Sequence, residues 1–239
     1  MKGVSGSGFN VSGSATGPGG SPETRNQKPP ALYTYPARPL NGGPFDKALP
    51  KRGAWAAEPK FNGWRALVHL PTGTIFNRHG ERLSIGAEFS TAIEILRCTL
   101  DAEAFHWADC EGLERRHNIG RGTLIVLDVI PKAQAYRDHT PMDYTERRSW
   151  LTPLAPPRSL TEIHPQSVYL TPSTLSVRDH SACNMNPQSM WDACRAANKS
   201  IGAIFYEGIV MKRADSLYPI QLRNPDETTP AWVKHRWHF

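Results

Sequence analysis

The sequence lacks the long apolar runs and the cysteine spacings that define several protein classes. No run approaches the roughly 20 apolar residues that a membrane-spanning helix needs, and the first residues lack the apolar stretch of a signal peptide. The four cysteines, Cys98, Cys110, Cys183 and Cys194, show neither metal-ligand spacing nor a compact disulfide framework. We therefore expect a cytoplasmic protein with reduced thiols and no membrane partner.

The N-terminal segment has few residues that could form a core. Residues 1–30 repeat Gly, Ser and Pro, a composition that does not bury enough apolar surface to fold. We predict a disordered tail over residues 1–30 and one domain over residues 31–239. The chain of 239 residues carries a net charge of +6, which favours an anionic partner such as a nucleic acid.

The spacing of apolar residues predicts a mixture of strands and helices. Residues 33–50 are expected to form an extended, proline-rich strap, and Ser84 is expected to cap the first helix. The predicted helices span residues 84–100, 143–151 and 190–199, and the predicted strands span residues 54–57, 64–70, 75–78, 105–113, 123–130, 166–170, 208–212 and 231–236. Strands dominate both ends of the domain, so the fold class is α+β with antiparallel sheets.

Lys60 is the main candidate for a nucleophile. It lies between Glu58 and an Asn-Gly turn at residues 62–63. A nucleophilic lysine must be deprotonated, whereas a free lysine has a pKa of about 10.4; nearby cations and partial burial lower this value. Arg65, Lys212, Lys234 and a bound metal ion are expected to supply that positive field.

The same cations suit a nucleoside triphosphate. They would neutralise its phosphates and stabilise the charge that develops at the α-phosphate. The carboxylates of Glu111 and Glu207 would then suit a ribose hydroxyl and a divalent metal ion, because magnesium prefers oxygen ligands. Each segment alone is commonly a solvated surface feature, and it is their joint occurrence in order that indicates a nucleotide pocket.

At these residues the chain resembles the covalent nucleotidyltransferases, which comprise ATP-dependent DNA ligases, RNA ligases and mRNA capping enzymes. Residues 58–67, EPKFNGWRAL, are most similar to the bacterial ATP-dependent DNA ligases. Further similar elements are NRHG at 77–80, DCEG at 109–112, IVLD at 125–128, EGIVMKR at 207–213 and WVKHR at 232–236. The resemblance implies an ATP-grasp-like adenylation (nucleotidyltransferase) domain of antiparallel sheets flanked by helices.

The resemblance also implies a role for each matching residue. Lys60 would attack the α-phosphate of ATP and form lysyl-AMP. The nucleotide would be held by Glu58 and Leu127 at the adenine, Glu111 at the ribose, Arg65 and Arg78 at ribose or phosphate, and Lys212, Lys234 and Arg236 at the α-phosphate. Glu207 and Glu111 would place Mg²⁺ or Mn²⁺.

The implied function is that of an ATP-dependent DNA ligase acting on nicked duplex DNA in repair, replication or recombination. AMP would pass from the lysine to a 5′-phosphate, and the adjacent 3′-hydroxyl would displace it. Two alternatives stay open, an RNA ligase and a degenerate domain that binds nucleotide and nucleic acid without completing ligation. The chain is expected to be a monomer.

Three departures from the family pattern bear on the alternatives. Asn62 stands where DNA ligases have an aspartate, and Leu127 replaces the aromatic residue that stacks on adenine, a loss of about 1 kcal/mol. The sequence ends three residues after Arg236, where the family continues into an OB-fold domain. The resemblance therefore implies that a separate OB-fold or partner protein takes part.

Overall fold

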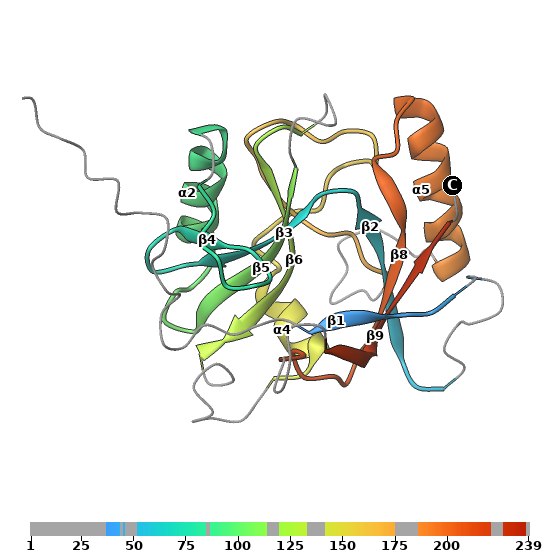
Figure 1. Cartoon of the computed structure of the whole chain (residues 1–239), viewed down its shortest axis with the longest axis horizontal. Coiled ribbons are helices and arrows are strands. Elements are labelled where there is room, and N and C mark those ends of the chain that lie inside the picture. Colours follow the sequence, from blue (N-terminus) through green and yellow to red (C-terminus); the bar gives the residue numbers. More distant parts are fainter. Residues whose placement is uncertain are drawn as a thin grey trace, which may run out of the picture.

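The computed structural model describes residues 37–43, 45, 52–84, 87–113, 120–132, 142–174, 186–220 and 227–237. The tail predicted over residues 1–30, most of the strap and Cys183 lie outside these ranges. The described strands form two sheets, with α2 and α5 on opposite sides of the molecule (Figure 1). None of the described helices is long and apolar enough to cross a membrane. The described cysteines, Cys98, Cys110 and Cys194, are not joined in disulfides with one another.

The first sheet has four strands in the order β1-β9-β8-β2. These are β1 (Arg38–Asn41), β9 (Thr228–Arg236), β8 (Tyr206–Arg213) and β2 (Trp55–Phe61). Helix α5 (Pro187–Ile201) packs on this sheet. It begins where the Asn186 side chain accepts a hydrogen bond from the Ser189 amide, with proline at its first turn, and it ends at Gly202 in a left-handed conformation.

The second sheet has five strands in the order β4-β3-β5-β6-β7. These are β4 (Thr74–Phe76), β3 (Trp64–His69), β5 (Phe105–Leu113), β6 (Thr123–Pro131) and β7 (Val168–Leu170). The 3-10 turn η1 (Ala87–Phe89) leads into α2 (Ser90–Thr99), which packs on this sheet. Helix α4 (Tyr144–Trp150) lies against β6 and begins with a reciprocal capping box between Asp143 and Glu146.

Alternation along the strands divides the core and leaves one face of the first sheet for polar residues. Ala57 and Phe61 of β2 and Ile209 and Met211 of β8 pack in the apolar cluster that includes α5. Glu58 and Lys60, which alternate with them on β2, point to the other face. One face of the first sheet packs on α5 and is apolar. Polar side chains therefore lie on the opposite face.

The strands and helices predicted from the sequence are present, with shifted ends, and the α+β class is confirmed. Two details differ. The strand pairs are antiparallel except β1–β9 and β6–β7, which are parallel. The predicted cap at Ser84 is wrong, because α2 begins only at Ser90, follows a 3-10 turn, and has Phe89 at its N-cap with no side-chain hydrogen bond.

Candidate active site

A cavity of about 270 Å³ opens on the polar face of the first sheet. It contains every residue that the sequence predicted for the site except Glu207, and it adds Arg38. Its lining comprises Arg38, Pro39, Glu58, Pro59, Lys60, Phe61, Gly63, Arg65, Arg78, Glu111, Leu127, Val210, Lys212, Trp232, Lys234 and Arg236. Segments separated by more than a hundred residues in the chain thus contribute side chains to one pocket.

Strand register explains why the separate motifs meet. Lys60 pairs with Gly208 of β8, and Gly208 pairs with Arg236 of β9. Two residues along, Glu58 pairs with Val210, which pairs with Lys234. Because paired residues share a face of a sheet and alternate residues along a strand do so too, these side chains line the cavity together.

Glu207 joins Lys60 to Arg236 at the edge of this cavity. Its Oε2 lies 2.6 Å from the Lys60 ammonium and 3.0 Å from a guanidinium nitrogen of Arg236. The Lys60 side chain is 18% exposed, so it is accessible to a ligand in the cavity. The nucleophile candidate is therefore held by a carboxylate and open on one side.

Glu58 and Lys212 form a buried ion pair at the base of the cavity. The Lys212 ammonium lies 2.9 Å from Glu58 Oε2 and donates a hydrogen bond of 2.7 Å to the Leu127 carbonyl. The Tyr144 hydroxyl donates to the other oxygen of Glu58, and Arg148 approaches it at 3.6 Å. Both oxygens of Glu58 are thus occupied by side chains of β8 and α4.

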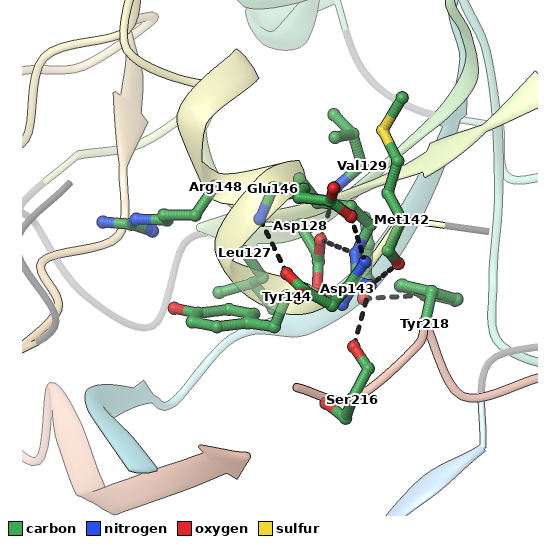
Figure 2. A network of polar contacts seen from close by, with 12 residues as sticks. Leu127, Asp128, Val129, Met142, Asp143, Tyr144, Glu146, Arg148, Ser216 and Tyr218 are labelled. Atoms are coloured by element: carbon green, nitrogen blue, oxygen red, sulfur yellow. Dashed lines mark hydrogen bonds and ion pairs between the residues drawn. The ribbon is translucent and has the colours of Figure 1, made fainter. Parts of the chain in front are cut away.

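A second buried ion pair fixes α4 against β6, behind Lys212. Arg147 donates to both oxygens of Asp128, at 2.8 and 3.0 Å, and to the carbonyls of Met142 and Ser216. Burial would raise the pKa of Asp128, but the charges of Arg147 and Lys212 lower it. Figure 2 shows Asp128 of β6 next to the first turn of α4, with Met142 and Ser216 in the same network of polar contacts.

Arg65 is held from the second sheet by a carboxylate on β5. It makes two hydrogen bonds to Asp109, at 2.8 and 2.5 Å, and the Tyr218 hydroxyl donates to the same carboxylate. The guanidinium lies 5.4 Å from the ring centre of Trp232, and the Lys212 ammonium lies 4.5 Å from it. Trp232 therefore has two cations against its ring, which is a favourable arrangement for an indole.

Glu111 faces the turn that follows Lys60. Its carboxylate accepts a hydrogen bond of 3.0 Å from the Gly63 amide. This approach requires glycine, because a Cβ at position 63 would lie 2.6 Å from the Gly112 carbonyl oxygen and 2.8 Å from the Glu111 side chain. Burial raises the pKa of Glu111 to about 7, against the opposing effects of Lys60 and of the Gly63 amide.

The raised pKa of Glu111 predicts a pH-dependent contribution to stability. Between the ordinary pKa of 4.5 and about 7, the folded protein binds more protons at this site than the unfolded chain does. The contribution is therefore complete below pH 4.5 and is lost as the pH rises through about 7. We expect Glu111→Gln to stabilise the protein relative to wild type at pH 8 by about 1–3 kcal/mol more than it does at pH 4.

Urea denaturation of wild type and Glu111→Gln at both pH values measures this difference. The matched control is Glu94→Gln, which replaces an exposed glutamate on α2. It should change the free energy of unfolding by the same amount at pH 4 and at pH 8. An equal effect of Glu111→Gln at pH 4 and pH 8 would show that its pKa is not raised.

Lys234 has a different environment from Lys212. Its ammonium has no hydrogen bond or ion pair with any residue in the described ranges. Burial lowers the pKa of Lys234, and the neighbouring charges of Arg236, Arg38, Lys60 and Arg78 act in the same direction. The cavity therefore has a strongly cationic side around Lys234, which fits a multiply charged anion.

The described residues contain no group of three or more His, Cys, Asp or Glu side chains that could hold a metal ion. Glu207, predicted as a metal ligand, already contacts two cations. Magnesium is commonly held by one or two carboxylates together with phosphate oxygens and waters. These residues fit an ion that arrives with nucleotide phosphates better than one held by the protein alone.

Asn62, the residue that departs from the family pattern, makes a local contact. Its side-chain amide donates a hydrogen bond of 3.0 Å to the Ile204 carbonyl, and its backbone amide donates to the Phe205 carbonyl. An aspartate could not donate the first of these bonds. The asparagine thus ties the turn after Lys60 to the segment that precedes β8.

The same arrangement of sheets occurs in solved ligase structures. The structure named Pmar-Lig_Pre matches with a TM-score of 0.52 and 16% identity, covering 85% of this chain and 46% of that one. Pmar-Lig_PreS3 matches with a TM-score of 0.51 and 15% identity, covering 85% and 47%. The chain has the fold of ligase nucleotidyltransferase domains.

Sequence identity to the solved ligase structures is low. The ligase domain of M. tuberculosis LigD also matches, with a TM-score of 0.49 and 20% identity over 87% of this chain and 60% of that one. The chain therefore spans about half the length of the first solved structures it matches. No family model and no curated protein matches the sequence.

Two contributors to the site were missed by the sequence analysis. Arg38 lies on β1, within the segment that the sequence indicated only as an extended strap. Tyr144 was placed on a predicted helix, but its hydrogen bond to Glu58 links residues 86 apart in the chain. Neither the prolines that flank Arg38, Pro36 and Pro39, nor a single tyrosine in a helix forms a sequence pattern that indicates a functional site.

Proposed function

We propose that this chain is an ATP-dependent DNA ligase that works through a lysyl-AMP intermediate on Lys60. The observation that carries the proposal is the convergence of Lys60, Lys212 and Lys234 on one cavity that also contains Glu58 and Glu111. A reactive amine beside several cations fits attack on a phosphate ester. The nucleotidyltransferase fold and the net charge of +6 support the same function.

In the first step the neutral amine of Lys60 attacks the α-phosphorus of ATP. A bond forms between Nζ and phosphorus, the bond from the α-phosphorus to the bridging oxygen breaks, and pyrophosphate leaves with the electron pair. The amine loses one proton, and the Glu207 carboxylate, 2.6 Å from Nζ, is placed to accept it. Lys212 and Lys234 would neutralise charge at the phosphate, and Glu58 and Leu127, which line the same cavity, would contact the base.

Lys212 must exchange partners for this role. In the nucleotide-free protein its ammonium pairs with Glu58 at 2.9 Å. A phosphate oxygen that approaches Lys212 competes with that carboxylate, which then becomes available as a hydrogen-bond acceptor for the amino group of a purine. Nucleotide entry thus replaces one internal ion pair by two contacts with the ligand.

A divalent ion, Mg²⁺ or Mn²⁺, would bind with the triphosphate and neutralise part of its charge. We propose Glu207 and Glu111 as the carboxylates that contact it. In the later steps AMP passes from Lys60 to the 5′-phosphate of a nicked DNA duplex, and the 3′-hydroxyl displaces AMP as the strands join.

Covalent labelling tests the first step directly. The protein is incubated with Mg²⁺ and ATP labelled at the α-phosphate, denatured and digested, and the labelled peptide is identified by mass spectrometry. We expect one AMP adduct, on Lys60, labile in acid as phosphoramidates are, and released as ATP when pyrophosphate is added. ATP binding without an adduct would instead favour the degenerate binding domain.

The nucleic-acid substrate is tested with the purified adenylated protein. Nicked duplexes are compared in which the 5′-phosphate strand, the 3′-hydroxyl strand or both are RNA. Transfer of AMP to the all-DNA nick, followed by sealing, is the expected result. Sealing restricted to RNA-containing nicks would contradict a DNA ligase and support the RNA ligase.

A further inference from the structure

Arg148 has a buried nitrogen that donates no hydrogen bond to any of the described residues. Its side chain is 8% exposed, and its Nη2 donates to the Thr171 carbonyl, which holds the guanidinium in place. The other terminal nitrogen, Nη1, is buried without an acceptor and lies 3.6 Å from Oε1 of Glu58. Buried donors in native proteins nearly always have an acceptor, so this one points to a contact that forms in another state of the site.

Arg148 and Tyr144 approach the same oxygen of Glu58 from one face of α4. They are four residues apart on the helix, a spacing that places two side chains on the same face. Figure 2 shows both side chains leaving α4 on the side away from Met142. The Tyr144 hydroxyl donates to Oε1 of Glu58, whereas Lys212 binds Oε2 at 2.9 Å. Burial and the charge of Glu58 raise the pKa of Tyr144, so this hydroxyl stays a neutral donor.

The Glu58 carboxylate needs a new cation if Lys212 moves. A phosphate that attracts Lys212 would leave the buried carboxylate with the neutral Tyr144 donor, and an uncompensated buried charge is strongly unfavourable. Arg148 lies just beyond hydrogen-bond distance of this carboxylate. A movement of less than about 1 Å would bring Nη1 to about 2.8 Å from the oxygen, the length of a charge-assisted hydrogen bond.

The other groups around Glu58 cannot take this place. Within the described residues, Lys212 and Arg148 are the two cations that lie within 4.0 Å of its carboxylate. Asp128, which lies 4.0 Å from Lys212, keeps its own cation, Arg147, when Lys212 moves. The adjoining hydroxyl of Ser173, 3.4 Å from that of Tyr144, is neutral. Arg148 is therefore the cation placed to compensate Glu58.

We propose that Arg148 is a positioning residue that replaces Lys212 as the cation beside Glu58 when a nucleotide binds. Glu58 then stays an ionised hydrogen-bond acceptor, which selects a purine that presents an amino group to it. The assignment rests on the proposed function, since it takes the cavity as a nucleotide site in which Lys212 binds phosphate. An ionised acceptor discriminates more sharply than a neutral one, because hydrogen bonds to charged groups are roughly twice as strong.

Proton uptake on ligand binding tests the exchange of cations. The probe is the α,β-methylene analogue of ATP, which binds as a triphosphate but cannot release pyrophosphate. Calorimetric titration with Mg²⁺ in two buffers of different ionisation enthalpy gives the number of protons bound with it. In Arg148→Gln the Glu58 carboxylate has no cation once Lys212 moves, so it binds a proton instead. We expect uptake of about half a proton or more beyond wild type near pH 7.

The preference for an amino group is measured with a second probe. This is the α,β-methylene triphosphate of purine riboside, whose base has no amino group. We expect wild type to bind the adenosine analogue about tenfold or more tighter than the purine riboside analogue. In Arg148→Gln this ratio should fall to about threefold or less, because a protonated Glu58 is a weaker acceptor.

Three substitutions separate the charge of Arg148 from its packing. Arg148→Lys keeps a cation and should behave like wild type, whereas Arg148→Gln and Arg148→Met should both take up the extra proton. Only Arg148→Gln keeps a donor for the Thr171 carbonyl, so an effect confined to Arg148→Met would reveal a packing role and overturn the proposal. The matched control is Arg213→Met, which removes an exposed arginine paired with Asp215 and should match wild type.

These measurements separate the inference from the proposed function, because neither needs a covalent step. Extra proton uptake in Arg148→Gln supports the exchange even if ATP leaves no adduct on Lys60. Equal proton uptake in wild type and Arg148→Gln, or an unchanged preference for the amino group, contradicts it even if the adduct forms. An ATP analogue that does not bind to wild type contradicts it as well.

Discussion

Lys60→Arg is expected to abolish the covalent AMP adduct, lowering its rate of formation by at least about a thousandfold. Arginine preserves the positive charge and a contact with Glu207, which lies 2.6 Å from the lysine ammonium. A guanidinium is not deprotonated in proteins and therefore offers no nucleophilic nitrogen. The substitution thus separates the chemical role of the amine from its electrostatic role.

Labelling with ATP that carries a radioactive α-phosphate, followed by denaturing electrophoresis, measures the loss. Lys199→Arg, an exposed lysine on α5 outside the cavity, is the matched control and should label at the wild-type rate. Persistent labelling of Lys60→Arg, mapped to Lys212 or Lys234, would assign the nucleophile to another strand of the sheet.

Arg147→Met is expected to lower the free energy of unfolding by about 3–5 kcal/mol. The guanidinium is fully buried and makes two hydrogen bonds to Asp128 and two to backbone carbonyls. Methionine fills much of the volume but leaves the Asp128 carboxylate and both carbonyls without those donors. Because this ion pair fixes α4 beside Glu58, nucleotide binding should weaken as well.

Urea denaturation at pH 7 measures the change in stability. Arg213→Met is the control, because Arg213 pairs with Asp215 on the surface, where both side chains are about half exposed or more; its effect should be under about 1 kcal/mol. Replacing both buried partners, Arg147→Met with Asp128→Leu, should restore part of the loss. A loss under about 1 kcal/mol for Arg147→Met alone would mean that Asp128 finds another partner.

The site residues were predicted best where charged residues occupy alternate positions of a strand. Glu58 and Lys60 on β2, and Lys234 and Arg236 on β9, were predicted as site residues from their motifs, and strand alternation places each pair on the cavity face. Local patterns sufficed there because a strand fixes which residues share a face. That these residues perform the roles assigned to them stays a prediction.

The parts that sequence reasoning missed depend on contacts between distant segments. The parallel pairing of β1 with β9 joins residues about 190 positions apart, and nothing near Arg38 encodes it. The Asp128–Arg147 ion pair links a strand to the start of a helix in the same way. The start of α2 was missed for a local reason, because a 3-10 turn keeps apolar residues at helix-like spacing before the helix begins.

The bridge from Lys60 through Glu207 to Arg236 also bears on which ligands the cavity admits. An incoming anion must displace a carboxylate that two cations already hold, so a singly charged ligand gains little from the exchange. A triphosphate brings enough charge to compete for both cations at once. If the proposed function holds, the bridge would favour highly charged nucleotides over AMP or inorganic monoanions, because only the former carry enough charge to replace Glu207 at both cations.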